Sequence, residues 1–173
     1  MKFGAALAAG VFLSAGAFAQ QNDRMSPADM KFARDAAQGG MEEVELGKIA
    51  VRNASSDAVK QFGQRMADDH SKAGIELKSW AATENVKLPA GIDAKQSALV
   101  RRLSGMRSAE LDRAYMRDMV KDHENDIAQF QKEASSGSDR DLQGFASKTL
   151  PTLRDHLRMA KETSKAVGAM SMK

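Results

Sequence analysis

The chain has 173 residues, a formal net charge of +3 and no cysteine. The lack of cysteine excludes disulfides, thiolate metal sites, a cysteine nucleophile and a lipid anchor on an amino-terminal cysteine. Acidic and basic residues are mixed along the chain without a basic stripe or interleaved aromatic residues, a pattern that argues against binding to nucleic acid.

The amino terminus has the pattern of a cleavable secretory signal. A lysine precedes an apolar run, and the small residues Ala17 and Ala19 lie just before Gln20. The run is shorter than the roughly 20 residues that a transmembrane helix needs, and no later segment is apolar enough to span a membrane. We therefore predict a signal peptide over residues 1–19, a short segment over residues 20–26, and a mature protein that is periplasmic or secreted. Peripheral association with an outer membrane stays open.

The rest of the chain is rich in helix-forming residues and lacks the alternating pattern of strands. Ser26, followed by a proline and an acidic third position, predicts the start of a helix over residues 27–53. A second helix is predicted over residues 57–85, after a short turn. The two helices should form an antiparallel hairpin because about three residues join them.

A long connection is predicted over residues 86–107. It contains the helix breakers Pro89 and Gly91, and then a short helix that Asp93 opens and Gly105 ends. The connection can span about 50 Å, whereas a helix of about 28 residues is about 42 Å long. It can therefore cross the whole bundle.

Two further long helices are predicted over residues 108–136 and 138–167, with Gly137 between them. Pro151 lies inside the last helix and should kink it, because proline removes a backbone donor and crowds the preceding turn. Residues 168–173 are predicted to be a disordered tail. The fold class is therefore all-α: a ferritin-like four-helix bundle over residues 27–167, with two antiparallel hairpins joined by a crossover that contains a short helix.

Three of the long helices place a histidine at the centre of their apolar face. His123 lies at helical spacing from Met119 and Phe130, and His70 and His156 have equivalent positions on the second and fourth long helices. These are all the histidines of the chain. A helix normally buries leucine at such positions, so three buried imidazoles need a physical reason.

The first long helix contributes an acid in place of a histidine. Among its clustered acids only Glu43 falls on the apolar face, whereas Glu42 and Glu45 are expected to point toward a basic side of the helix. Counting residues from the turns places one inward residue from each helix near mid-bundle. These four predicted ligands are Glu43, His70, His123 and His156.

Two interpretations of this quartet remain open. Buried ionisable groups must be paired or neutralised. In one interpretation the four side chains form a metal-free hydrogen-bonded polar core that sets the helix register. In the other they bind a single transition metal ion (Zn, Fe, Mn or Cu), for which three imidazoles and one carboxylate are suitable ligands. No motif predicts an organic cofactor.

Other polar residues are candidates for a supporting role around the quartet. Asp69, Asp122 and Asp155 each precede a histidine, and they could orient the ligands or remain solvated. Asp112 and Tyr115 lie on the inner side of the third long helix, where they could hydrogen bond into the site or simply pack between helices.

Three stretches resemble a known bacterial family: AAQGGMEEVELGKIAVRNASSDAVKQFGQRMADDHSKA, LDRAYMRDMVKDH and FASKTLPTLRDHLRMA. The family is called domain of unknown function 4142, and the resemblance covers residues 27–161. It implies an exported ferritin-like bundle whose activity is not established. It also implies an acid at Glu43, histidines at His70, His123 and His156, and an acid-x-x-tyrosine turn at Asp112 and Tyr115.

The wider resemblance to ferritins does not extend to their metal site. A di-iron site of that type uses two Glu-x-x-His pairs. Here the residues three before the histidines are Ala67, Val120 and Leu153. The sequence therefore predicts a mononuclear site or a metal-free relic, and neither a ferroxidase nor a storage cage.

Three functions are compatible with these observations. The first is an exported protein that binds one transition metal, in envelope metal handling or a stress response. The second is a non-enzymatic structural or interaction protein of the envelope with a metal-free polar core. The third is a mononuclear-metal enzyme acting on oxygen or peroxide. No catalytic residue, protein partner or oligomeric state can be assigned from the sequence.

Overall fold

The protein is described by a computed structural model that places residues 25–169. The predicted signal peptide, most of the segment 20–26 and the end of the predicted tail lie outside these residues. The described part contains five helices: α1 (Pro27–Asn53), α2 (Asp57–Thr83), α3 (Ala94–Ser104), α4 (Ser108–Ser136) and α5 (Arg140–Ala166).

The helices begin where side chains can satisfy their free backbone amides. Ser26 and Asp29 form a capping box at the start of α1, and Asp93 and Gln96 form another at the start of α3. The carboxylate of Asp139 accepts a hydrogen bond from the amide of Leu142 in the first turn of α5. Helix α5 continues through Pro151 to its end at Ala166.

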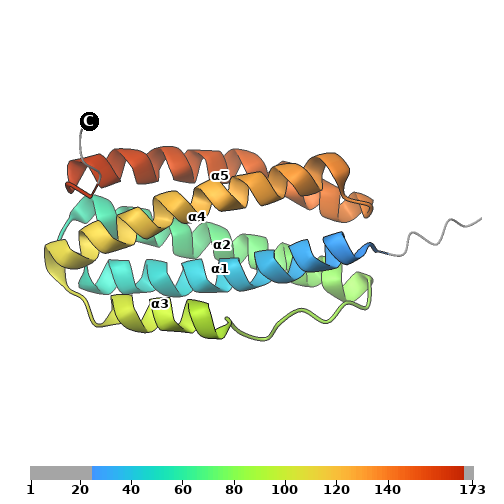
Figure 1. The fold of residues 1–173 in the computed structure, drawn as a ribbon, viewed down its shortest axis with the longest axis horizontal. Coiled ribbons are helices and arrows are strands. Elements are labelled where there is room, and N and C mark those ends of the chain that lie inside the picture. The colour runs from blue at the N-terminus through green and yellow to red at the C-terminus, as the bar shows by residue number, and fades with distance from the viewer. Residues whose placement is uncertain (1–24, 170–173) are drawn as a thin grey trace, which may run out of the picture.

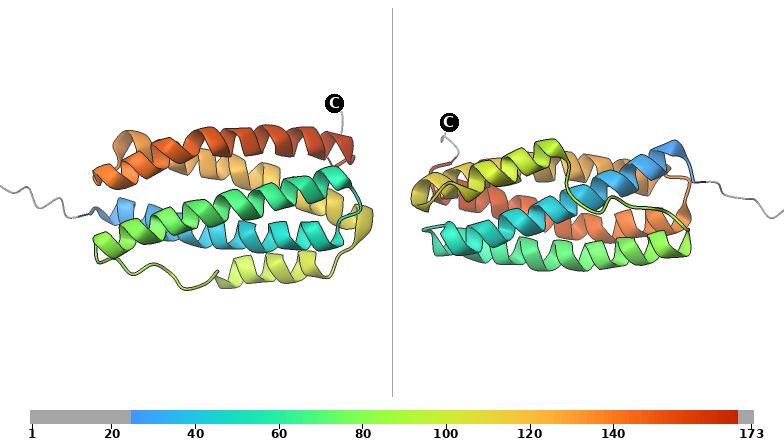
Figure 2. Two further views of the ribbon diagram at one scale, coloured as in Figure 1. Left: turned by 180° about the vertical axis from the view of Figure 1, so that it is seen from behind. Right: turned by 90° about the horizontal axis from the view of Figure 1, so that it is seen from below.

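The arrangement is a four-helix bundle with one long crossover, which confirms the predicted fold class (Figure 1). Helices α1 and α2 form one antiparallel hairpin, and α4 and α5 form the other. Between them the chain runs back along the outside of the bundle, so α2 and α4 point in the same direction. The short helix α3 of this crossover packs along α1, as the view from below shows (Figure 2).

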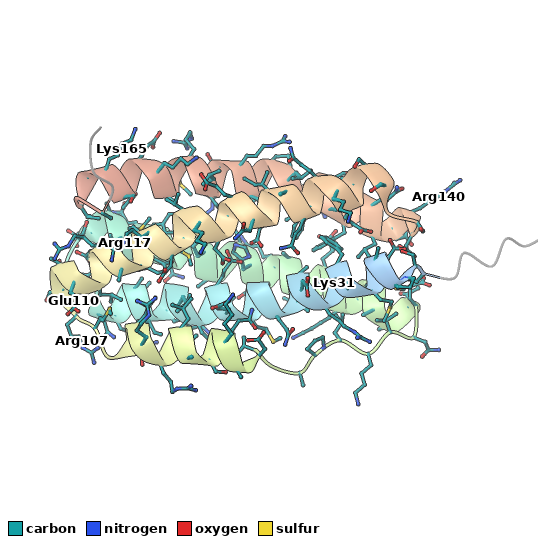
Figure 3. The ribbon with its side chains drawn as sticks, in the orientation of Figure 1. Lys31, Arg107, Glu110, Arg117, Arg140 and Lys165 are labelled. Carbon is teal, nitrogen blue, oxygen red and sulfur yellow. The ribbon has the colours of Figure 1, made fainter. Side chains whose placement is uncertain are left out.

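The surface of the bundle is charged and most of its interior is apolar. Charged side chains such as Lys165 and Arg140 project outward from the helices (Figure 3). No helix among residues 25–169 is long and apolar enough to cross a membrane.

Two apolar clusters fill the interior, one toward each end of the bundle. One cluster contains Leu46, Met66 and Met119, and the other contains Phe32 and Leu77. On α1, α2 and α4 the members of the first cluster and those of the second lie on opposite sides of a central level along the helix. Buried polar residues occupy this level, so the apolar clusters seal them from both ends.

Hydrogen bonds tie the hairpins together at the end where α1 begins. Asp29 accepts a hydrogen bond from the amide of Ser138, in the α4–α5 turn, at 3.0 Å. The indole of Trp80 donates to Asp139 at 3.1 Å. Glu133 is buried beside Asp29, and burial together with the Asp29 charge raises its pKa to about 7.

Helices α1 and α2 approach each other closely at one pair of glycines. A Cβ atom on Gly63 would lie 2.8 Å from both the Cβ of Ala50 and the carbonyl oxygen of Gly47. About three turns further along α2, Gly74 is different, because a Cβ there would meet no atom within 4 Å. Glycine inside a helix costs roughly 0.5–1 kcal/mol relative to alanine. Close packing explains Gly63, and it does not explain Gly74.

The two glycines predict opposite effects of the same substitution. We expect Gly74→Ala to stabilise the protein by up to about 1 kcal/mol, because alanine favours the helix and its methyl group meets open space. We expect Gly63→Ala to destabilise it by about 1–3 kcal/mol, because the methyl group overpacks the contact between α1 and α2. Urea unfolding followed by circular dichroism measures both, and equal effects would contradict the interpretation.

Candidate metal centre

The structure brings Glu43, His70, His123 and His156 together at the central level of the bundle. Each comes from a different long helix, and all four are buried, with exposed fractions between 0% and 8%. One nitrogen of each histidine lies within 4.8 Å of one nitrogen of each of the others. The three imidazoles therefore form one cluster beside the carboxylate.

Two of the histidines are held by hydrogen bonds on their outer nitrogens. Nδ1 of His123 lies 3.0 Å from the carbonyl oxygen of Met119, and Nε2 of His156 lies 3.1 Å from Oδ2 of Asp69. Carbonyl and carboxylate oxygens can only accept, so in the neutral rings these two nitrogens carry the protons. The inner nitrogens, Nε2 of His123 and Nδ1 of His156, then direct lone pairs toward each other at 3.3 Å. Two lone pairs at this distance repel each other, and a cation bound between them would relieve the repulsion.

The two carboxylate oxygens of Glu43 contact His70 and His123. Oε2 lies 2.8 Å from Nδ1 of His70, and Oε1 lies 3.5 Å from Nε2 of His123. Oε1 of Glu43 and Nε2 of His70 are buried and have no hydrogen-bond partner. Two unsatisfied buried polar atoms in one cluster are costly, because each loses its hydration without replacement.

Burial sets the protonation of the centre. Loss of hydration, with the neighbouring imidazoles, lowers the pKa of His123 to about 3. Loss of hydration lowers that of His156 to about 4 and also lowers the pKa of His70. Burial, with the charges of nearby acids, raises the pKa of Glu43 well above its ordinary value. At neutral pH the centre therefore presents three neutral imidazoles, which is the form that binds metals.

The structure adds two acids of α4 to one side of the centre. Oxygens of Glu43, Asp122 and Asp126 lie within 4.8 Å of one another. Burial, followed by the charges of Glu43 and Asp122, raises the pKa of Asp126 well above its ordinary value. The sequence analysis did not select Asp126. Asp126 comes three residues after His123, and this helical spacing could have indicated that the two side chains lie on the same side of α4.

Glu42 is a correction to the sequence analysis, which placed it on a basic outer side of α1. It is only 7% exposed, and burial, followed by the charge of Asp122, raises its pKa to about 7. The physical reason is the crossover: α3 lies against α1 and brings Gln96 to the Glu42 side chain. The face of α1 that carries Glu42 is thus covered by α3 instead of exposed to solvent.

The remaining predicted supporting residues have different surroundings. Asp69 contacts His156 and is held in turn by the guanidinium of Arg65. Asp155 instead lies at the surface, where it pairs with Arg158.

Asp112 and Tyr115 are buried nearer the α1–α2 turn. Asp112 lies outside the centre, because its carboxylate accepts hydrogen bonds from the amides of Ser55 and Ser56 at 3.0 Å. It therefore holds the turn between α1 and α2 from a neighbouring helix. Tyr115 packs edge-on against Phe62, and its hydroxyl has no partner. Burial, with the charge of Glu43, raises the pKa of Tyr115 well above its ordinary value.

Two spaces border the centre at His70. The outer groove, of about 430 Å³, lies between α1, α2 and the loop over residues 88–92. The inner cavity, of about 30 Å³, is lined by Glu43 and Asp126 among others. Gly40, Gly74 and His70 line both spaces. Gly40 and Gly74, which have no side chain, thus lie beside His70 and line both the groove and the cavity.

Comparison with known proteins agrees with this architecture. Residues 15–163 match the family described as Domain of unknown function (DUF4142). The chain belongs to this family. The expected family membership is therefore confirmed. No curated protein matches the chain.

Two crystal structures of DUF305 proteins share the fold. A DUF305 fragment from Deinococcus radiodurans superposes with a TM-score of 0.71 at 13% identity, over 84% of this chain and 99% of that one. A DUF305 protein from Streptomyces coelicolor superposes with a TM-score of 0.71 at 14% identity, over 84% of this chain and 96% of that one. At such low identity the likeness concerns the fold alone.

The protonation of the centre can be tested in metal-free protein. Because the pKa values of His123 and His156 are lowered to about 3 and 4, both rings should remain neutral at pH 5 in the folded state. The unfolded chain binds these protons near pH 6.5, so the stability that the two histidines contribute should be lost as the pH falls from about 6.5 toward 4. Nitrogen NMR of the imidazoles reports both charge and tautomer. Rings that titrate near pH 6.5 in folded protein would contradict this prediction.

Proposed function

We propose that this protein binds a transition metal ion through Glu43, His70, His123 and His156 and that it acts in metal handling in the cell envelope. The observation that carries the proposal is the direction of the histidine lone pairs. Met119 and Asp69 hold the outer nitrogens of His123 and His156, and the inner nitrogens converge at 3.3 Å.

The spacing of these nitrogens suits a shared metal ion. Two nitrogens that bind one zinc ion at about 2.0–2.1 Å in tetrahedral geometry lie roughly 3.3–3.4 Å apart. A bound ion would also satisfy Oε1 of Glu43 and Nε2 of His70, the two unpaired atoms of the cluster. Imidazole and carboxylate ligands suit Zn²⁺, Fe²⁺, Mn²⁺ and Cu²⁺, so the residues fit the ion.

Asp69 supports this assignment as a positioning residue. A histidine that binds a metal commonly donates its other ring hydrogen to a carboxylate, which fixes the tautomer and makes the ligand more basic. Asp69 accepts from His156 in this way, and its pKa is lowered by the hydrogen bonds of Arg65 and His156 in spite of partial burial. It therefore remains ionised and keeps Nδ1 of His156 free for the ion.

A metal-dependent enzyme acting on oxygen or peroxide is a second candidate. The outer groove favours it, because one member of the quartet, His70, lines the groove. No residue of the groove identifies a substrate, and metal handling requires fewer assumptions.

The location in the envelope is supported by the sequence of residues 1–19 and by one structural relative. The signal-like segment contains the cleavage pattern before Gln20. The Streptomyces coelicolor DUF305 protein carries the description of a secreted protein.

Metal analysis of the exported protein tests the proposed function. We expect protein purified without a metal-binding tag to contain at least one transition metal ion per chain. Glu43→Gln and His123→Gln should each weaken binding by more than about 100-fold, since loss of a supporting partner alone weakens metal binding by about 10–100-fold. Elemental analysis and competition with a chelator of known affinity measure these changes.

A matched control is Glu133→Gln, which removes a buried acid of α4 at the end of the bundle where α1 begins. This variant should bind the metal like the wild type. If neither the wild type nor the variants bind a metal while the wild type unfolds at the highest temperature, the quartet is a metal-free polar core and the proposal is wrong.

The predicted export has its own test. Expression of residues 1–173 should yield a mature protein that begins at Gln20, because cleavage is predicted to follow Ala19. Amino-terminal sequencing and the intact mass of protein from the periplasmic fraction check this. An uncleaved chain in the cytoplasm would contradict export.

A further inference from the structure

The outer groove has the size and the lining of a site for a small organic molecule. Its volume is about 430 Å³, within the roughly 300–1,000 Å³ that is usual for ligand pockets. Helix α1 provides Met41 and Val44, helix α2 provides Ile75, and the loop before α3 provides Leu88 and Ile92. Two helices and a loop thus border a hollow whose lining is mostly apolar.

Two features of this groove are not explained by packing. Ile75 is 70% exposed, and it is the one large apolar side chain that is exposed among residues 25–169. A single exposed apolar residue is ordinary on a surface, but this one lines a hollow together with other apolar residues. Beside it, a Cβ atom on Gly74 would meet no atom within 4 Å. The apolar lining therefore stays open to a molecule that could cover it.

The charged residues make one end of the groove basic. The contact between Glu43 and His70 sets the register of the antiparallel helices α1 and α2. Lys78 lines the groove eight residues after His70. Arg34 lies nine residues before Glu43, and at 1.5 Å per residue this brings it to nearly the level of Lys78. Both cations are exposed, and neither forms an ion pair within residues 25–169.

The opposite end of the groove has no such excess of charge. Lys48 lines it there, and Glu45 lines it one helical turn before Lys48, so the two charges offset each other. At a rise of 1.5 Å per residue, the levels of Lys48 and Lys78 are about 20 Å apart. The groove is therefore long and apolar, and it has a net positive charge only at the Lys78 end.

The width of the groove favours a single extended chain. Spread over about 20 Å of length, the volume corresponds to a mean cross-section of about 20 Å². An α-helix with its side chains is about 10–12 Å across, which is much wider. A partner helix therefore does not fit into the hollow, whereas an alkyl chain does.

We propose that the outer groove binds a free linear alkyl carboxylate, a fatty acid, with its chain along Met41, Val44 and Ile75 and its carboxylate at the Lys78 end. The inference concerns binding alone, goes beyond the proposed function and does not depend on a metal ion. Burial of the alkyl chain supplies the favourable free energy. The unpaired cations Lys78 and Arg34 select an anionic head group over a neutral or cationic one.

Isothermal titration calorimetry of the exported protein with laurate tests the site. We expect one laurate per chain, and dodecyltrimethylammonium, which has the same alkyl chain and a positive head group, should bind at least about fivefold more weakly. Lys78→Glu should weaken laurate binding by about three- to tenfold. Gly74→Leu should weaken it by at least about tenfold, because the leucine side chain would occupy the groove while the helix is kept.

Lys60→Glu is the matched control, because it makes the same charge change on α2 at a residue that pairs with Asp57 and does not line the groove. It should bind laurate like the wild type, and circular dichroism verifies that each variant is folded. No binding of laurate, or binding that neither Lys78→Glu nor Gly74→Leu weakens, would overturn the proposal. A dimer that Ile75→Ser dissociates, without laurate binding, would overturn it in favour of a second copy of the chain. Elemental analysis of the same samples tests the metal site separately, so the two proposals can fail independently.

Discussion

The burial of ionisable side chains at the central level of the bundle is the constraint on which the rest of the structure depends. An unpaired charge in an apolar interior is far more costly than the marginal stability of a domain allows, so each group must be neutral, hydrogen bonded or bound to a cation. The three histidines meet this constraint by staying neutral, and Met119, Asp69 and Glu43 each hold one of their ring nitrogens. The same partners orient the rings inward. Stability and ligand geometry therefore have one origin.

The apolar clusters on either side strengthen this arrangement. They exclude water from the centre, which lowers the pKa values of the imidazoles and raises those of the acids. The same low dielectric would strengthen the interaction of a cation with the carboxylates. A site built in this way releases protons from the acids when the metal binds, so its affinity should increase with pH.

The glycines of α1 and α2 fall into two pairs with different surroundings. Gly47 and Gly63 allow the backbones of α1 and α2 to touch, which fixes the distance between the helices. Gly40 and Gly74 line both the outer groove and the inner cavity, and a Cβ atom at either position would meet no atom closer than 4.0 Å. The first pair serves the fold. The second pair lowers helix propensity, and close packing does not require it.

The sequence by itself determined the helices, the crossover and the four inward residues. Helical periodicity, capping residues and loop lengths are local signals, and each long helix had one polar residue on an apolar face. What it left open was whether the polar core binds a metal, because the same residue types serve both interpretations.

Only the tertiary structure decided which side chains surround the quartet. Asp69 directly precedes His70 in the sequence and yet contacts His156 of another helix, while Asp155 pairs with Arg158 at the surface. Glu42 is buried because α3 covers it. Asp126 of α4 lies close to Glu43 of α1 because of how the two helices are rotated against each other. Periodicity places a residue on a face to within a wide angle, whereas a contact depends on how helices distant in the sequence rotate and approach. For that reason the inward quartet was predictable from the sequence, and its acidic side was not.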